Sequence, residues 1–423
     1  MMGHGTFPME ENRPASAFRR YRYGGCLAGC GVLLAAVLAF SLRLAYAGIL
    51  EQEGGLAALA RAAALDPWNA SYHAALADLL ERHGLNPEPE LALACRLDPH
   101  HAGHWIRRAI RAEMRGEIAA AERSYLEAAR VDHQFAPRTA LMNFYFRQGD
   151  APNFWIWARR SFERSYGDRA AAFQLCWMTT PDPAAILERA LPPDAETLRQ
   201  FLVFAADRAG PRQAMPVGRA LLDLRDIESR NALLNYCDRL RQAGLLDDAK
   251  TIWDGMARRG LVPANEPGNL LTNPLFRTLP SGRGFDWRLF PTPEVALTPA
   301  DPELGFSVDF SGDQPEACPL IRQIVPVPEE SLSFGVEYRT SSAADNGLRV
   351  AVEDAVAGEA AKPLLEAGIE PSLYWTVLRL PVPRAKSRFV CVAVRYRRKP
   401  GTVRYSGRVE FRRLRLSGNS SGR

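Results

Sequence analysis

Residues 102–132 read AGHWIRRAIRAEMRGEIAAAERSYLEAARVD, two helix-forming segments on either side of a single glycine. Gly116 with the following glutamate forms the turn between the segments. In the second segment small and large side chains share one face, at Ala121, Tyr125 and Ala128. Small side chains let two helices approach, and the large ring fills the space beside them. The stretch therefore predicts a pair of antiparallel helices.

The unit ends in the corner Val131-Asp132-His133, and similar three-residue corners occur twice earlier in the chain. The first two aspartates of the recurring corners are 32 residues apart and the next interval is 34. A period in this range is typical of stacked helical repeats, in which no unit buries its apolar face alone. The pattern weakens between about 170 and 224, where helices are still expected, and returns at 233–256. The corners read Leu65-Asp66-Pro67, Leu97-Asp98-Pro99 and Val131-Asp132-His133.

The unit 102–132 resembles a tetratricopeptide repeat, with Trp105 at the aromatic position of the first helix and Asp132 at the closing corner. The resemblance implies a curved rod of helix pairs whose concave groove binds peptides or extended segments of other proteins. The residues with which some family members clamp a terminal carboxylate are not visible, so the groove is expected to be partly apolar. An alternative is that its isoleucines only pack on the next repeat. The groove positions in this unit are Ile106, Ile110, Glu113 and Met114.

An apolar run near the N-terminus predicts a membrane-spanning helix. Residues 24–42 carry no charge, and 19 helical residues span about 28 Å, close to the thickness of the hydrocarbon core. Arg19, Arg20 and Arg22 precede the run. The excess of positive charge on that side predicts an N-terminus in the cytoplasm and the rest of the chain outside. Arg43 follows the run and can extend to the membrane interface.

The same segment has three other possible interpretations. Ala45-Tyr46-Ala47 resembles a signal-peptidase site, so cleavage after Ala47 is the alternative to a retained anchor. Leu27-Ala28-Gly29-Cys30 matches a lipoprotein cleavage box in its letters, but it lies at the start of the apolar run instead of after it, which argues against lipidation. A buried helix of a soluble protein is disfavoured because the run is apolar on all faces.

After residue 265 the apolar period changes from helical to alternating. Runs at 306–310, 332–338, 348–352 and 390–394 alternate apolar and polar residues, with Gly, Pro, Asn and Asp clusters between them. Period two over several short runs predicts an antiparallel β-sandwich. The chain is thus expected to be a multidomain α + β protein, with a transmembrane helix, an α-solenoid and a C-terminal jelly roll.

The order of the β segments resembles the galactose-binding-like jelly rolls, a group that includes many carbohydrate-binding modules. The resemblance is carried by Asn269–Phe276 followed by Gly284–Trp287, and then by Phe306–Gly312. It implies a domain that binds sugar, lipid or protein, or that braces a neighbour, because the fold alone does not determine the function.

A bound sugar would need an exposed aromatic platform or a charged face. Several large aromatic residues are candidates for the platform, although large aromatics in a small sandwich more often belong to its core. Residues 384–415 contain twelve Lys and Arg and one acidic residue, so the last strands could bind an anionic polysaccharide or lipid headgroups. The alternative is an ordinary solvated face. The candidates are Trp287, Tyr374, Trp375, Arg395, Arg397 and Tyr405.

The sequence offers little for chemistry. Its net charge of +5 over 423 residues does not indicate nucleic-acid binding. His100 and His104 lie at a repeat corner without an acidic cluster, so no metal is expected, and no cofactor motif is present. None of the 7 cysteines forms a CxxC pair; Cys318 and Cys391 could pair if the β domain lies outside the cytoplasm.

These observations predict a non-catalytic scaffold in the bacterial inner membrane, its bulk extracytoplasmic. Its repeats would dock a protein partner and its β domain would contact glycan or membrane, in assembly or export of an envelope polysaccharide. The alternatives are a purely structural scaffold and a glycan-active enzyme with an unrecognised site. The expected parts are a basic tail at 1–23, a transmembrane helix at 24–48, tetratricopeptide-like repeats at 52–262, a galactose-binding-like sandwich at 265–417 and a disordered tail at 418–423.

Overall fold

A computed structural model describes residues 15–299, 305–355 and 363–418. Most of the expected basic tail and nearly all of the expected C-terminal tail therefore lie outside the described residues. The chain forms two compact units, Met1–Arg164 and Ser165–Arg423. The boundary falls within the predicted solenoid, so the last helices share a unit with the β domain.

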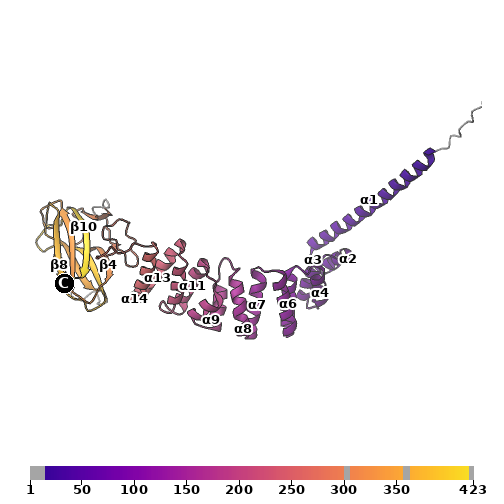
Figure 1. The fold of residues 1–423 in the computed structure, drawn as a ribbon. Coiled ribbons are helices and arrows are strands. Elements are labelled where there is room, and N and C mark those ends of the chain that lie inside the picture. The colour runs from indigo at the N-terminus through magenta and orange to yellow at the C-terminus, as the bar shows by residue number, and fades with distance from the viewer. Residues whose placement is uncertain (1–14, 300–304, 356–362, 419–423) are drawn as a thin grey trace, which may run out of the picture. The chain divides into compact units, whose positions relative to one another are not determined.

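The first unit is a series of antiparallel helix pairs (Figure 1). The turn inside each pair uses a left-handed residue where the sequence predicted one: Gly116 has φ 77°. Ala121, Tyr125 and Ala128 are at most 1% exposed, which confirms the predicted packing face. The helices are α1 (Ala15–Glu53), α2 (Leu56–Leu65), α3 (Ala70–Arg82), α4 (Glu88–Leu97), α5 (Ala102–Met114), α6 (Ile118–Val131), α7 (Phe135–Gln148) and α8 (Ala151–Phe162).

Helix α1 joins the predicted membrane segment to the repeats without a break. Its part Gly29–Glu53 is 25 residues long and apolar enough to cross a membrane, although a signal sequence has the same length and composition. The last turns of α1 pack on α2 and α3, with Ala47 0% exposed and Leu50 3% exposed. Cleavage after Ala47 would therefore remove a core residue of the first helix pair.

The second unit begins with further helix pairs. Asp194 accepts a hydrogen bond from the backbone N–H of Thr197 at 2.8 Å and so caps α11, the helix start that the sequence predicted. The helices are α9 (Ala170–Thr179), α10 (Pro183–Ala190), α11 (Ala195–Arg208), α12 (Met215–Asp223), the 3₁₀ turn Ile227–Ser229, α13 (Arg230–Gln242) and α14 (Leu246–Arg258).

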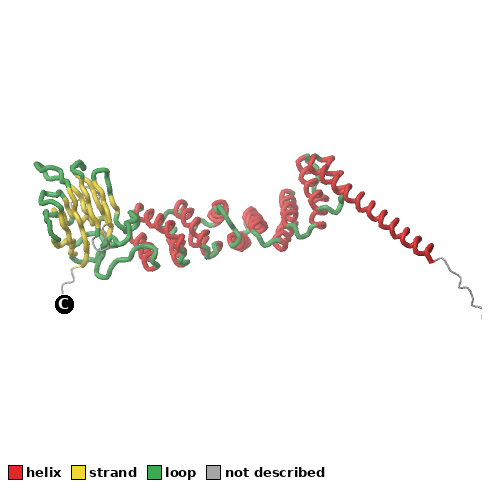
Figure 2. The backbone as a smooth tube through the Cα atoms, turned by 90° about the horizontal axis from the view of Figure 1, so that it is seen from above, coloured by secondary structure: helices red, strands yellow, loops and turns green. Residues whose placement is uncertain are grey.

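The β domain of this unit is an antiparallel sandwich of two sheets, with strand orders β1-β4-β9-β6-β7 and β2-β3-β10-β5-β8. Figure 2 shows its strands gathered in layers. Alternate residues face inward, so Phe306, Phe334 and Phe411 are at most 2% exposed. The strands are β1 (Arg288–Leu289), β2 (Val295–Pro299), β3 (Phe306–Phe310), β4 (Ala317–Pro326), β5 (Leu332–Thr340), β6 (Leu348–Asp354), β7 (Leu365–Gly368), β8 (Thr376–Val382), β9 (Phe389–Arg397) and β10 (Gly407–Gly418).

The loop that leads into β1 fastens the sandwich to the last helix pair. Phe285 packs against Trp253 of α14 and Phe389 of β9, with ring centroids 6.1 and 6.2 Å apart. The backbone N–H of Gly284 donates to Asp238 of α13 at 2.8 Å. Trp253 and Phe285 are at most 1% exposed, so the β domain and the helices of this unit share a buried contact.

Candidate binding sites

A groove lies between α5 and α7, the first helices of two consecutive pairs. Its cavity has a volume of about 520 Å³. Two of the predicted groove residues expose apolar surface to it: Ile110 is 42% exposed and Met114 is 72% exposed. Ile106 is half-buried and is not among the residues that line the cavity. The lining residues are Ile110, Glu113, Met114, Tyr125, Ala140, Asn143 and Arg147.

An ion pair forms the polar part of this groove. Glu113 accepts hydrogen bonds from Nε and Nη2 of Arg147 at 2.7 and 2.8 Å, and from the Tyr125 hydroxyl at 3.0 Å. The Arg147 hydrogen bonds lower the pKa of Glu113, and they outweigh the effect of burial. Because Arg147 and Glu113 neutralise each other, the groove offers apolar contacts beside an already satisfied polar pair.

A second groove lies between α11 and α13 in the other unit, again between the first helices of consecutive pairs. Its cavity has a volume of about 480 Å³. Val203 is 53% exposed, and Arg239 forms an ion pair with Asp207. The lining residues are Leu202, Val203, Ala206, Ala232, Asn235, Tyr236, Asp238, Arg239, Gln242 and Arg283.

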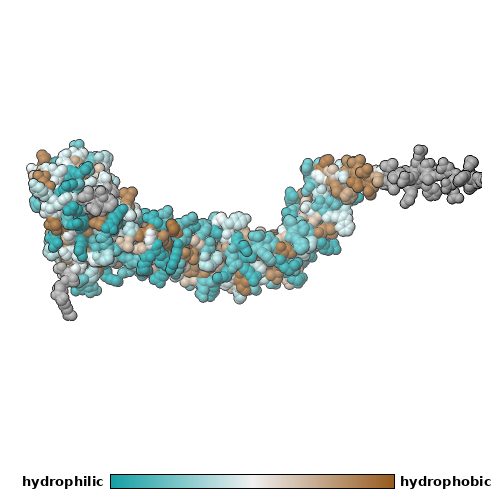
Figure 3. Space-filling model, turned by 45° about the horizontal axis from the view of Figure 1, so that its top comes forward, coloured by the Kyte–Doolittle hydropathy of each residue, from teal (hydrophilic) through white to brown (hydrophobic). Residues whose placement is uncertain are grey.

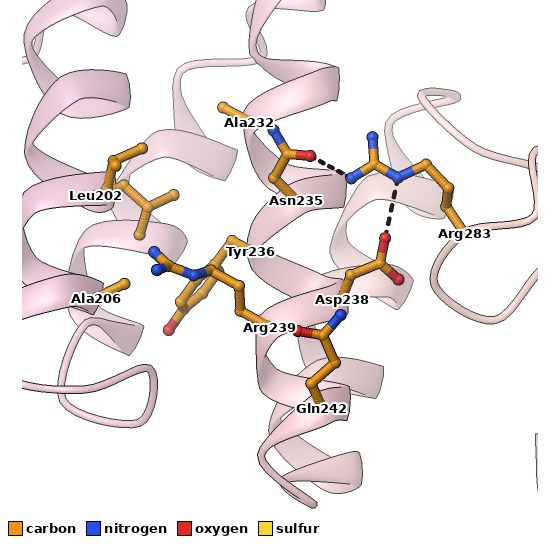
Figure 4. A pocket seen from close by; sticks show the side chains of 10 residues that line it. Leu202, Ala206, Ala232, Asn235, Tyr236, Asp238, Arg239, Gln242 and Arg283 are labelled. Atoms are coloured by element: carbon orange, nitrogen blue, oxygen red, sulfur yellow. Dashed lines mark hydrogen bonds and ion pairs between the residues drawn. The ribbon is translucent and has the colours of Figure 1, made fainter.

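Arg283 comes to this groove from the loop that precedes the β domain. Its Nε donates to Asp238 at 2.9 Å, and its Nη2 donates to Asn235 (Figure 4). The sequence did not single out Arg283, which lies 45 residues from Asp238. In the sequence, the available signal was that Arg283 directly precedes Gly284, the first residue of a segment that resembles the galactose-binding-like jelly rolls. Only the fold brings Arg283 to α13.

The aromatic candidates of the β domain divide into core and surface. Trp287 is 0% exposed, and its indole N–H donates to the carbonyl of Asn273 at 3.2 Å. Tyr405 is 2% exposed and packs edge-on against Phe310. Both rings therefore fill the sandwich core, the alternative that was favoured for large aromatic residues, and neither belongs to an exposed platform.

Trp375 and Tyr374 lie outside the core, just before β8. The guanidinium carbons of Arg412 and Arg339 are 3.9 and 4.9 Å from the centroid of the Trp375 ring. Both arginines belong to neighbouring strands of the same sheet, and Trp375 is half-buried on them. Tyr374 is 82% exposed. The structure thus places an aromatic surface on the outer side of the sheet β2-β3-β10-β5-β8.

The arginines beneath Trp375 are held by carboxylates. Arg412 Nε donates to Glu337 at 2.7 Å, and Arg339 pairs with Glu410. Burial alone would raise the pKa of Glu337, but hydrogen bonds from Arg412 and Arg413 outweigh it and lower the pKa. These alternating charges fix the arginine planes on which the indole lies.

The cationic face expected on the last strands is largely neutralised. Arg395 contacts Glu353 and Glu366 at 2.9 and 3.2 Å, while Arg397 is exposed. Acids from distant parts of the chain supply most of the partners, so the local excess of basic residues is not an excess of surface charge. Further ion pairs between residues 384 and 415 are Arg384–Glu329, Arg388–Asp247, Arg398–Glu316, Lys399–Asp345, Arg404–Glu316, Arg408–Asp309, Arg412–Glu337 and Arg413–Glu337.

Neither a disulfide nor a metal centre is found in the described parts of the chain. Cys318 aligns with Tyr396 across the β4–β9 ladder, five residues from Cys391, and both cysteines are free. Within the same residues no group of three His, Cys, Asp or Glu could hold a metal. His104 is buried and stacks on His101 at 4.1 Å, and burial lowers its pKa.

No family model matches the chain, and no curated protein matches it. Solved structures resemble parts of it. A CBM4 module is 7% identical with a TM-score of 0.28, covering 35% of this chain and 99% of its own. A CBM61 module solved with β-1,4-galactotriose is 17% identical with a TM-score of 0.26, covering 36% and 99%. YrrB, a tetratricopeptide protein with an unusual peptide-binding site, is 13% identical with a TM-score of 0.23, covering 48% and 91%.

These similarities concern parts of the chain and are at low sequence identity. The chain combines a series of antiparallel helix pairs with an antiparallel β-sandwich of two sheets. Because the fold alone does not determine the function, its ligands are inferred from its own residues.

Proposed function

We propose that this chain is a membrane-anchored, non-catalytic scaffold whose helical grooves hold extended segments of a protein partner. The groove between α5 and α7 is the observation that carries the proposal. It presents Ile110 and Met114 to solvent beside a hydrogen-bonded Glu113–Arg147 pair. Exposed apolar side chains beside polar groups suit an extended peptide, because the apolar surface takes up its side chains and the polar groups fix its orientation.

The anchor is α1, whose apolar part Gly29–Glu53 passes directly into the first repeat. The arginines before the apolar run favour an N-terminus in the cytoplasm and repeats outside it. In this proposal the chain lies in the bacterial inner membrane with its bulk extracytoplasmic. Assembly or export of an envelope polysaccharide is the concrete role that this arrangement suits.

The β domain contributes a glycan-binding surface at Tyr374 and Trp375. Aromatic rings stack on the apolar faces of sugar rings, and the neighbouring Glu337 and Arg339 can hydrogen-bond hydroxyl groups. Arg395 and Arg397 lie on β9 in the other sheet and form a second polar surface there. In this proposal Arg397 binds an acidic sugar or a lipid headgroup.

A peptide array probed with the full-length protein in nanodiscs tests the groove. Met114→Glu places a charge in the apolar part of the groove, and we expect it to reduce binding of any captured peptide at least tenfold. Leu126→Glu is the matched control, because Leu126 is 41% exposed on α6 and does not line the cavity. Equal loss in both variants would contradict the proposed groove.

A glycan array tests the aromatic surface. Trp375→Ala should abolish binding of any captured oligosaccharide, whereas Trp68→Ala, a change of an exposed tryptophan in the first unit, should not. No bound glycan, or binding unchanged in Trp375→Ala, would leave the β domain as a brace for the last helix pair. That second candidate, a purely structural β domain, is favoured by the buried contact of Phe285 with Trp253. Turnover of any oligosaccharide would contradict the non-catalytic assignment.

A further inference from the structure

The surface of α1 changes character at one point. Between residue 29 and Arg43 its apolar side chains are uncovered: Leu38 is 61% exposed and Leu42 is 61% exposed. After Arg43 one side of the helix is packed, with Ala47 and Leu50 buried. Figure 3 shows the apolar surface concentrated where α1 leaves the repeats. The charge-free run 24–42 therefore ends where protein packing begins.

Helix α2 turns back along α1 to this same point. The turn at Gly54 and Gly55 reverses the chain, and α2 has 10 residues, a length of about 15 Å. Arg43 lies the same number of residues before the end of α1. The guanidinium Nη2 of Arg43 donates to the carbonyl of Ala64, near the end of α2, at 3.5 Å. The α2–α3 corner is thereby held beside the first charged residue after the apolar run.

This corner is rigid and carries an uncovered tryptophan. Asn69 caps α3 by accepting a hydrogen bond from Ser71 at 3.0 Å. His73 Nε2 lies 3.2 Å from the carbonyl of Pro67, and its Nδ1 lies 2.6 Å from Glu90 of α4. Trp68, between these contacts, is 81% exposed. A large aromatic ring held outward by a fixed corner contributes little to the core of its own unit.

We propose that Trp68 lies in the interfacial layer of the membrane that α1 crosses and holds the first repeat against the lipid surface. This inference rests on the proposed anchoring by α1. Tryptophan favours the headgroup level, where its ring is apolar and its N–H can reach a polar partner. Arg43 is at the same level, and Tyr46, 51% exposed, lies about one turn further along α1. The occupant of this surface is a lipid bilayer and not a protein.

Quenching of tryptophan fluorescence by brominated lipids tests the proposal on the full-length protein in nanodiscs. Lipids brominated near the headgroup should quench part of the emission, and Trp68→Phe should remove most of that quenched component. Leu38→Trp is the control for the anchor, because its new ring, five residues or about 7.5 Å before Arg43 along α1, should be quenched by lipids brominated midway along their acyl chains.

The outcomes separate the inference from the anchoring on which it rests. If Leu38→Trp is quenched and Trp68→Phe changes nothing, α1 spans the bilayer but the corner stands away from it, and the inference is overturned. The inference is also overturned if Trp68 is shielded both from acrylamide, a water-soluble quencher, and from the brominated lipids. That result would indicate that a protein contact covers Trp68. If Leu38→Trp is not quenched either, the anchoring fails together with the inference.

Discussion

Glu113 of α5 and Arg147 of α7 form a two-hydrogen-bond ion pair across the groove of the first unit, at 2.7 and 2.8 Å. The pair joins consecutive helix pairs that are 34 residues apart in the chain. It thereby links the geometry of the repeat to the chemistry of the groove, because the same contact that holds α7 on α5 also neutralises the groove.

Glu113→Gln should destabilise the first unit by roughly 1 kcal/mol near neutral pH. The effect is small because Arg147 is 48% exposed and water screens the pair. The pKa of Glu113 is lowered in the folded state from its usual 4.5, so its contribution is present above about that pH and is lost as the pH falls through the folded-state pKa.

Thermal unfolding of wild type and Glu113→Gln as a function of pH measures this effect. The difference between the two proteins should shrink below pH 4.5. Glu117→Gln is a control, since Glu117 pairs with Arg115 at the surface and does not line the groove. A difference that stayed constant in acid would show that the ionised carboxylate is not what stabilises the groove.

Gly284→Ala should loosen the β domain from the last helix pair. Gly284 has φ +55°, and an added Cβ would lie 2.5 Å from the ring of Trp253. Trp253 is fully buried and cannot move aside, so overpacking and backbone strain together should cost about 2–4 kcal/mol. Chemical unfolding followed by tryptophan fluorescence measures the loss.

Gly282→Ala provides the matched comparison two residues earlier. Gly282 has φ +70°, but an added Cβ would meet no atom within 4 Å. Only the backbone strain applies there, about 1 kcal/mol. Equal destabilisation by both changes would show that the contact with Trp253 does not govern the junction.

Cys318 and Cys391 should remain unlinked under oxidising conditions. Tyr396, the neighbour of Cys318 across the ladder, is five residues from Cys391, a separation of about 16 Å along β9, whereas a disulfide needs Cα atoms within about 7 Å. Burial raises the pKa of Cys391 to about 11. Both thiols should react with an alkylating agent only after denaturation, as mass spectrometry of the modified protein would show; a linked peptide would contradict the strand register.

Removal of residues 1–47 should weaken the first helix pair. The shortened α1 would lack Ala47, and its remaining turns are too few to form a stable helix against α2. Amide hydrogen exchange in α2 and α3 should become faster, while exchange in Ser165–Arg423 should not change. Unaltered protection of α2 would mean that α1 is dispensable for the repeat, as a cleaved signal sequence would be.

Much of the fold follows from local pattern. The faces of α5 and α6 could be predicted because helix periodicity puts Ala121, Tyr125 and Ala128 on one side. The strands could be predicted because alternation persists through each run, and the antiparallel sandwich is confirmed. The groove residues Ile110, Glu113 and Met114 were predicted from their place in the repeat and do line one cavity.

The sequence by itself determined the architecture of this protein: an apolar helix, helical repeats and a β-sandwich, because hydrophobic periodicity is a local property of the chain. Only the tertiary structure decided which aromatic rings are free, since Trp287 and Trp375 both lie just before a strand, but the Trp287 ring is buried in the core and the Trp375 ring lies on arginines at the outer side of its sheet. It also decided the charge of the last strands, because acids such as Glu316 and Glu337 reach their arginines across more than seventy residues. Ion pairing, and the burial of single rings outside the periodic segments, depend on contacts between distant segments that no local pattern encodes.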